Sequence, residues 1–288
     1  MNLTNQIESF CKHLNTKGRS SSTITAYKTD LTQFSKFIGE QELKEISTRD
    51  INKFQKFLFR ENNLTKKSIT RKLNSIKSFF KFAIESENLV KNPAEKIAYP
   101  QTEDTAPKKL SQIEYKAIRD TARANPKIYT MIELMLQTGM KIGELSRLKL
   151  EEVKLDSNPP HIFIGQYQTN PSRIVELNDP ARESMRQYIE NRPKVRDDQG
   201  YLFPTRTGRR TLPRNIRTAM NRVFENAGVK SATVNELRNT FICHQIEHGM
   251  SLERLAEIVG HKHTASTELY LATTDREEPG RELDIAEL

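Results

Sequence analysis

Three stretches near the C-terminus decide the fold: T-V-N-E-L-R-N-T-F-I at 233–242, L-A-E-I-V-G-H at 255–261 and T-E-L-Y at 267–270. Their apolar residues recur at helical spacing, which predicts helices over 233–248, 251–259 and 265–272. These segments carry an arginine, a histidine and a tyrosine: Arg238, His261 and Tyr270. Arginine binds phosphate oxygens, histidine donates a hydrogen bond or a proton, and tyrosine can attack phosphorus. If the three converge, they can cleave a phosphodiester.

The sequence before these stretches is also mostly helical in pattern. Apolar spacing predicts helices from Ser111 to about Arg123, and over 126–138, 179–191 and 213–227. Two β-prone runs, His161–Ile164 and Arg173–Leu177, are separated by polar residues and a proline, which predicts a small hairpin. Residues 110–274 are therefore expected to form one α-rich domain around a small β-hairpin or sheet.

The N-terminal third has its own helical pattern. Amphipathic helices are predicted over 3–15, from Ser20–Thr23 to Gly39, from Ser47 to Leu58, and over 65–87. Four helices within residues 1–91 predict a compact bundle. Residues 92–109 contain three prolines and no periodic pattern, which is typical of an interdomain linker. A length of 288 residues accommodates two such domains.

The distribution of charge indicates a polyanionic partner. The net charge is +9, and residues 1–100 hold 18 basic and 10 acidic side chains, so the excess lies in the N-terminal third. Six of these basic residues crowd the fourth helix: Lys66, Lys67, Arg71, Lys72, Lys77 and Lys81. A charged helix face is often merely solvated. The N-terminal third is nevertheless the main candidate for contact with the DNA backbone, and the family resemblance given below favours that interpretation over a solvated face.

Several other classes of protein are disfavoured. Cys11 and Cys243 are too few for a disulfide framework or a thiolate metal site. His244 and His248 stand four residues apart without a further ligand, so no metal site is expected. The N-terminus lacks a signal-peptide pattern and no apolar run is long enough to span a membrane. A cytoplasmic protein is expected.

The three C-terminal stretches resemble the signature of the tyrosine recombinase (phage integrase) family. Residues 138–145, T-G-M-K-I-G-E-L, match the family's T-G-x-R-x-x-E-L frame, and Asn235–Arg238 stands at its H-x-x-R box. Tyr270 follows Gly260-His261 by the nine residues that the family requires. The resemblance covers nearly the whole chain. It implies a mainly α fold, with an N-terminal SAM-like four-helix core-binding domain and an α-rich catalytic domain.

The resemblance also implies an activity and partners. Tyr270 would cleave DNA by forming a 3′-phosphotyrosyl bond and releasing a 5′-hydroxyl, in site-specific recombination or integration. No cofactor is implied, because the covalent link stores the bond energy. The implied partners are double-stranded DNA with a specific recombination site and other copies of the chain, as a tetramer on two duplexes.

The chain departs from the family pattern at three catalytic positions. Lys141 stands where the family has an arginine, and lysine lacks the planar fork that binds two oxygens. Asn235 replaces a histidine and cannot transfer a proton. The turn at 165–173 lacks the family's lysine, and Arg173 is its nearest basic residue, either a poor proton donor or a phosphate contact. Glu144 is expected to orient these basic side chains.

The tail at 275–288 holds two basic and six acidic residues, with Leu283, Ile285 and Leu288 as a small apolar face. The resemblance implies that it docks on a neighbouring subunit, and a frayed terminus is the alternative. The three departures leave a second interpretation of the whole chain open. A catalytically inactive, sequence-specific DNA-binding regulator could use the same scaffold, whereas Arg238, His261 and Tyr270 in register favour an enzyme, weakened by Lys141.

Overall fold

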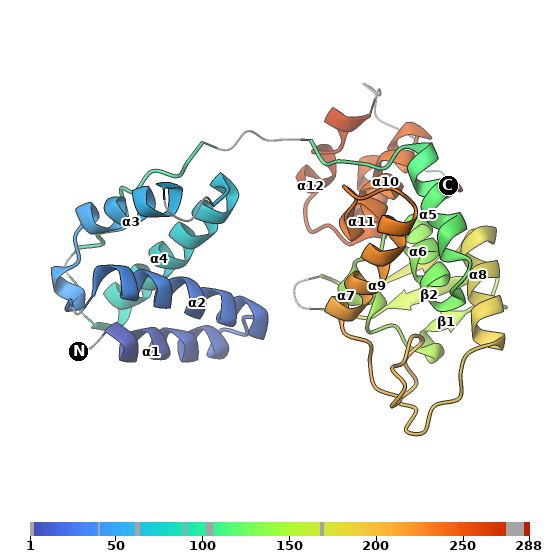
Figure 1. Ribbon diagram of the computed structural model, residues 1–288, viewed down its shortest axis with the longest axis horizontal. Helices are drawn as coiled ribbons and strands as arrows, with labels where there is room; N and C mark the ends of the chain where they lie inside the picture. Colours follow the sequence, from blue (N-terminus) through green and yellow to red (C-terminus); the bar gives the residue numbers. More distant parts are fainter. Residues whose placement is uncertain are drawn as a thin grey trace. The chain divides into compact units, whose positions relative to one another are not determined.

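The computed structural model describes residues 3–39, 41–60, 64–87, 89, 91–101, 106–167, 170–274 and 285–288. The chain divides into two compact units, residues 1–104 and 105–288. Helices dominate both units, and the second also holds one small sheet (Figure 1). The predicted mainly α fold is confirmed, and the unit boundary falls inside the segment predicted as a linker.

The described residues of the first unit contain four α-helices: α1 (Leu3–Thr16), α2 (Ser21–Ile38), α3 (Thr48–Arg60) and α4 (Lys66–Glu87). A short 3₁₀ turn, η1 (Leu43–Glu45), precedes α3. Ser20 begins α2 because its hydroxyl accepts a hydrogen bond from the backbone N–H of Thr23, at 3.2 Å. The apolar faces meet in a core with fully buried phenylalanines from every helix: Phe10, Phe34, Phe54, Phe79 and Phe80.

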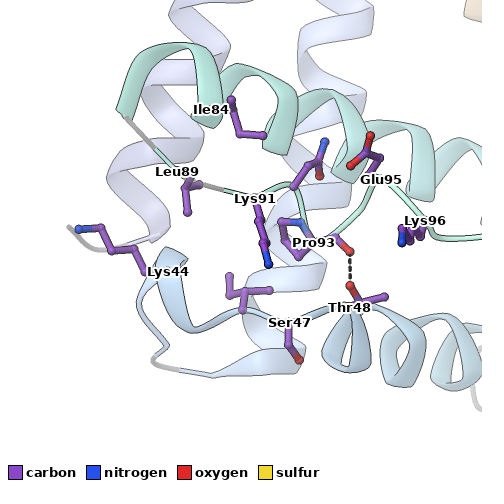
Figure 2. Close-up of a pocket in the computed structure, with 11 residues that line it drawn as sticks. Lys44, Ser47, Thr48, Ile84, Leu89, Lys91, Pro93, Glu95 and Lys96 are labelled. Atoms are coloured by element: carbon purple, nitrogen blue, oxygen red, sulfur yellow. Dashed lines mark hydrogen bonds between the residues drawn. The ribbon is translucent and has the colours of Figure 1, made fainter.

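The start of the predicted linker packs on this bundle. Ala94 and Ile97 are buried in its core, and the Thr48 hydroxyl donates a hydrogen bond of 2.8 Å to the carbonyl of Pro93. A groove of about 1000 Å³ lies beside this bond, with Lys44, Lys91 and Lys96 among its lining residues (Figure 2). The first residues of the predicted linker therefore belong to the first unit.

The second unit surrounds helix α6 (Pro126–Thr138), in which Ile128 and every residue from Thr130 to Thr138 are buried. A helix that is buried on all sides is the centre of a core. The helices around it are α5 (Gln112–Ala122), α7 (Ile142–Leu145), α8 (Asp179–Glu190), α9 (Pro213–Asn226), α10 (Val234–Glu247), α11 (Leu252–Val259) and α12 (Ala265–Glu268). Two 3₁₀ turns, η2 (Leu150–Glu152) and η3 (Leu271–Thr273), complete the unit.

The sheet has three antiparallel strands in the order β1 (Val153–Lys154), β2 (His161–Ile164) and β3 (Arg173–Glu176). Ile162 of β2 lies opposite Val153 on one side and Val175 on the other. The predicted hairpin is thus present as β2 and β3. The prediction missed β1 because two residues are too short to show strand alternation.

The last predicted helix, 265–272, is divided in the structure into α12 and η3, and Tyr270 lies between them. The backbone N–H of Tyr270 bonds to Thr267 three residues back, at 3.0 Å, as in a 3₁₀ turn. Residues 285–288 lie on the second unit of their own chain: Ile285 and Leu288 pack against its core, and the backbone of Ala286 exchanges two hydrogen bonds with Gln245. Leu283 lies outside the described residues.

Candidate active site

Arg238 lies on α10 and is held from both sides by backbone carbonyls. Its guanidinium donates to the carbonyl of Gly139 and, at 2.9 Å, to that of Val259. Gly139 ends α6 in the left-handed conformation, with φ 60°, and a Cβ there would collide with Phe241. Burial lowers the pKa of Arg238 to about 10, so that its side chain is still a cation at neutral pH.

Lys141 immediately precedes α7, and its ammonium lies between two segments distant in sequence. Lys141 Nζ is 2.7 Å from Oδ1 of Asn170, in the turn before β3, and 3.5 Å from the carbonyl oxygen of Gly260. Burial and the charge of Arg238 lower the pKa of Lys141 to about 8. The ammonium therefore carries a proton at neutral pH and loses it more readily than an exposed lysine does.

Glu144 and Arg173 form a buried, bidentate ion pair. Arg173 Nη1 and Nη2 lie 2.9 Å from Oε1 and Oε2 of Glu144, and Arg173 Nε donates to the carbonyl of Ile258 at 2.6 Å. Burial raises the pKa of Glu144, but hydrogen bonds and the charge of Arg173 outweigh it and hold the pKa below its usual value. Glu144 also accepts a hydrogen bond of 2.8 Å from the backbone N–H of Lys141.

This ion pair corrects the role expected for Arg173. Its side chain is only 7% exposed, and three hydrogen bonds direct its guanidinium inward. Such a side chain fixes β3 to α7 and α11 and is not a free phosphate contact. The carboxylate of Glu144 touches both the Arg173 guanidinium and the Lys141 backbone, and its orienting role stays a prediction.

His261 follows Gly260, which ends α11 in the left-handed conformation with φ 67°. Its Nδ1 lies 2.9 Å from the hydroxyl oxygen of Thr267. Burial and the nearby cations Arg238, Lys141 and Arg173 lower the pKa of His261 to about 4. The imidazole of the free protein is therefore neutral at physiological pH, able to accept a proton or donate a hydrogen bond.

The Tyr270 ring stacks near His261, with 6.3 Å between the ring centroids. The Tyr270 hydroxyl donates a hydrogen bond of 2.9 Å to Oδ1 of Asn239, on α10. Burial raises the pKa of Tyr270, and the charge of Arg238 opposes this effect. Asn235 is exposed in the first turn of α10, three residues before Arg238.

The second unit thus brings together Lys141, Arg238, His261 and Tyr270, from four separate segments. Around them stand two asparagines that the sequence did not single out, Asn170 and Asn239. Asn239 directly follows Arg238 in N-E-L-R-N. This position beside a predicted site residue is the feature of the sequence that could have identified Asn239. Asn170 carried no such signal, because its contact with Lys141 exists only after the turn has folded.

The basic residues of α4 separate into exposed and buried groups. Lys66, Lys67 and Lys81 are exposed. Arg71 is about half exposed, and both of its terminal nitrogens donate hydrogen bonds to the buried carboxylate of Asp30. Lys77 lies over the ring of Tyr99, with Nζ 4.3 Å from the centroid.

Lys72 does not fit the expected DNA-contacting face. Its side chain is 10% exposed, and its ammonium lies 2.9 Å from the Asp30 carboxylate. A buried carboxylate requires such a partner, because an unpaired charge in the core costs several kcal/mol. Lys72 therefore shares the neutralisation of Asp30 with Arg71, and its burial in the bundle corrects its assignment to the DNA-contacting set.

A second basic segment was missed by the sequence prediction. Residues 199–224 contain six arginines and no acidic residue: Arg206, Arg209, Arg210, Arg214, Arg217 and Arg222. All of these except Arg210 are exposed, on the loop before α9 and on α9 itself. The balanced charge of residues 101–288 concealed this segment, although its local arginine density was visible in the sequence.

The structure also bears on whether the chain has a metal site or a membrane-spanning helix. Among the residues that the structure describes, no group of three or more histidine, cysteine, aspartate or glutamate side chains could hold a metal ion. Within the same residues, no helix is both long enough and apolar enough to cross a bilayer.

Comparison with known proteins adds independent information. Residues 108–277 match the model of the phage integrase family, and residues 7–87 match the phage integrase N-terminal SAM-like domain. The chain is 31% identical to tyrosine recombinase XerD of Staphylococcus saprophyticus, over 92% of each chain. It is 27% identical to tyrosine recombinase XerC of Staphylococcus carnosus, over 90% of this chain and 88% of the relative.

Solved structures share the fold at lower identity. A lambda integrase tetramer bound to a Holliday junction superposes with a TM-score of 0.77 at 18% identity, over 100% of this chain and 80% of that one. The Tn1549 transposon integrase in complex with transposon right-end DNA has a TM-score of 0.77 at 19% identity, over 96% of both chains. With both of its units matched by the family's domain models, the chain belongs to the phage integrase family of tyrosine recombinases.

Proposed function

We propose that this protein performs site-specific DNA recombination by cleaving and rejoining strands through Tyr270. The observation that carries the proposal is the convergence of four side chains in the second unit. Arg238 is bonded to Gly139 and Val259, Lys141 reaches Gly260, and the adjacent His261 stacks near Tyr270. A phenol among two cations and a neutral imidazole suits attack on a phosphodiester.

In this proposal each group has a defined task. Arg238 and Lys141 bind the non-bridging oxygens and stabilise the negative charge that grows in the pentavalent transition state. Tyr270 leaves its hydrogen bond with Asn239 and attacks phosphorus, and His261 accepts the phenol proton. The Glu144–Arg173 pair holds α7 and β3, and with them Lys141 and the turn at Asn170, in place. The phosphotyrosyl bond retains the energy needed for rejoining.

Two basic surfaces are proposed to hold the duplex. The first consists of Lys66, Lys67, Arg71, Lys77 and Lys81 on α4, and the second of the arginines between 206 and 222. Contacts of lysine and arginine with phosphates supply affinity that falls as salt rises. Arginines at the start of a helix can also reach base edges in a groove, which is how a site is distinguished from bulk DNA.

Assembly and location follow from the same proposal. Strand exchange between two duplexes needs four nucleophiles, so four protomers are proposed to act together. The lambda integrase homologue of the same fold was solved as a tetramer on a Holliday junction. The surface that binds residues 285–288 within the chain is proposed to receive this segment from a neighbour in that assembly. The similar XerC and XerD proteins come from bacteria, in which DNA lies in the cytoplasm, and this protein is proposed to act there as well.

A trapping experiment on duplexes of random sequence tests the cleavage activity and finds the target at the same time. A pool of nicked duplexes with two to three helical turns of randomised sequence is incubated with the protein, and protein-linked DNA is isolated under denaturing conditions and sequenced. The proposal predicts adducts that share a sequence motif and disappear with Tyr270→Phe. Absence of any adduct from a pool that the protein binds in a gel-shift selection would contradict it.

The alternative, a DNA-binding regulator without catalysis, is favoured by two observations. Asn235 is exposed at the start of α10 and cannot transfer a proton. Arg173 is locked into an internal ion pair. The regulator would select a motif from the same randomised pool in the gel-shift experiment and would leave no covalent DNA.

A further inference from the structure

The proposed cleavage lacks an evident acid. When the bond between phosphorus and the 5′-oxygen breaks, the leaving alkoxide requires a proton, and the turn at 165–173 contains no lysine to provide it. Arg238 and Arg173 are guanidinium groups, which do not release protons at neutral pH. The amide of Asn235 is not an acid either, and the imidazole of His261 is already neutral.

We propose that Lys141 is the general acid that protonates the 5′-oxygen, an inference that rests on the proposed recombinase function. Its ammonium is 2.7 Å from Asn170 in the turn before β3. The residue directly before α7 thus brings an ammonium group to Asn170. Two departures from the family pattern then compensate for each other. The turn has no lysine to act as the acid, and Lys141, at the family's arginine position, supplies the proton instead.

The charges around Lys141 suit a proton donor. Burial disfavours its protonated form, as do the charges of Arg238 on α10 and Arg173 on β3, whereas the charge of Glu144 opposes these effects. Glu144 on α7 is the nearby carboxylate, but both of its oxygens bind Arg173. The two acceptors of the Lys141 ammonium, Asn170 Oδ1 and Gly260 O, are neutral. In the described part of the chain, no carboxylate pairs directly with this ammonium, which therefore stays free to give up a proton.

The step balances without a further reagent. The Tyr270 oxygen forms a bond to phosphorus, its proton passes to His261, and the electron pair of the broken bond leaves with the 5′-oxygen. Lys141 gives its proton to that oxygen and becomes a neutral amine. In rejoining, the amine takes the proton back from the attacking 5′-hydroxyl, and His261 returns its proton to the phenol. An arginine at position 141 would bind the phosphate but could not perform this transfer.

A substrate with a sulfur leaving group separates this role from phosphate binding. A duplex of the trapped sequence is prepared with either oxygen or sulfur at the 5′-bridging position. A thiolate leaves without protonation, because thiols are far more acidic than alcohols. The protein as it exists is compared with Lys141→Arg, and with Lys262→Arg as a matched control at an exposed lysine beside His261.

If Lys141 is the acid, Lys141→Arg lowers single-turnover cleavage of the oxygen substrate on the order of 100-fold and changes cleavage of the sulfur substrate by less than about fivefold. Lys262→Arg leaves both rates unchanged. If Lys141→Arg lowers the cleavage rate equally on both substrates, or raises it on both, Lys141 only binds the phosphate and is not the acid. A sulfur-rescued defect in Lys262→Arg would assign the acid to that residue instead.

The same experiment separates the inference from the function on which it rests. If the unaltered protein forms Tyr270-dependent adducts but the sulfur substrate does not rescue Lys141→Arg, the recombinase stands and the acid assignment falls. If the unaltered protein cleaves neither substrate, the recombinase proposal itself fails. Equal duplex affinity of the unaltered protein and Lys141→Arg, measured by fluorescence anisotropy, establishes that the variant is folded and bound.

Discussion

The hydroxyl of Tyr270 donates a hydrogen bond to the side-chain oxygen of Asn239, at 2.9 Å. The amide nitrogen of Asn239 in turn donates to the carbonyl of Lys108, also at 2.9 Å, in the residues that lead into α5. The Tyr270 hydroxyl, the proposed nucleophile, is therefore bonded to α10, and Asn239 in turn is bonded to the residues before α5. In the proposed cleavage, Tyr270 would break this bond before it attacks phosphorus.

Asn239→Ala is expected to accelerate cleavage. A hydrogen bond of this type contributes about 1 kcal/mol net, so that its loss raises the single-turnover rate of adduct formation about fivefold. Thr273→Val is the matched control, because it removes a neighbouring hydrogen bond to Pro107 without touching the phenol. A rate as low as that of Tyr270→Phe would instead show that Asn239 holds the tyrosine in its reactive position.

Cleavage should decrease at alkaline pH. The acid role requires protonated Lys141, whose pKa in the free protein is about 8. As pH rises through this value, the ammonium becomes an amine, and the second-order cleavage rate should fall about tenfold per further pH unit. A pH series with DNA below saturation checks this expectation. Lys141→Arg should lack the decline between pH 8 and 9, and a decline that persists in this variant would have to arise from another group.

Arg173 is predicted to act on stability more than on DNA affinity. Arg173→Met leaves the Glu144 carboxylate buried without its partner, because the two side chains are 7% and 1% exposed. Breaking such a pair costs about 3–5 kcal/mol, which urea unfolding would detect. Combining Arg173→Met with Glu144→Gln should recover most of this loss. A stable Arg173→Met protein with weakened DNA binding would restore the original phosphate-contact interpretation.

Two lysines on α4 should differ in whether their substitution affects stability or DNA binding. Lys72→Ala removes one of the two cations that bind the buried Asp30, with Arg71 remaining, and is expected to destabilise the protein by about 2 kcal/mol. Lys67→Ala changes an exposed residue, should alter stability by less than about 0.5 kcal/mol and should weaken DNA binding. Urea unfolding and fluorescence anisotropy on both variants test this. The assignment fails if Lys67→Ala destabilises and Lys72→Ala does not.

The arginines of α9 should contribute to the salt dependence of binding. Arg214 and Arg217 are exposed, one turn apart, at the start of this helix. Each phosphate contact that is lost reduces the slope of log affinity against log salt by about 0.9. Arg214→Ala and Arg217→Ala should each show this change, and Lys230→Ala serves as the control at an exposed lysine beyond α9. Unchanged slopes for both arginine variants would exclude α9 from the duplex interface.

Much of the architecture was predictable from the sequence, because the buried face of an amphipathic helix has apolar residues at a regular spacing. The helices from α1 to α6 and from α8 to α11 follow the predicted ranges closely. The short elements did not show this signal: β1 has two residues and α7 four, and neither is long enough for its pattern to repeat. The break at Tyr270 was also invisible, because it depends on a local change of hydrogen bonding.

The sequence by itself determined the two α-rich units and the order of Lys141, Arg238, His261 and Tyr270 along the chain, because helical periodicity and motif spacing are local properties. Only the tertiary structure decided which charges are free to act. It buried Lys72 against Asp30 and Arg173 against Glu144, and it left the Lys141 ammonium between two neutral oxygens. The physical reason is that desolvation and ion pairing depend on neighbours brought together from distant parts of the chain.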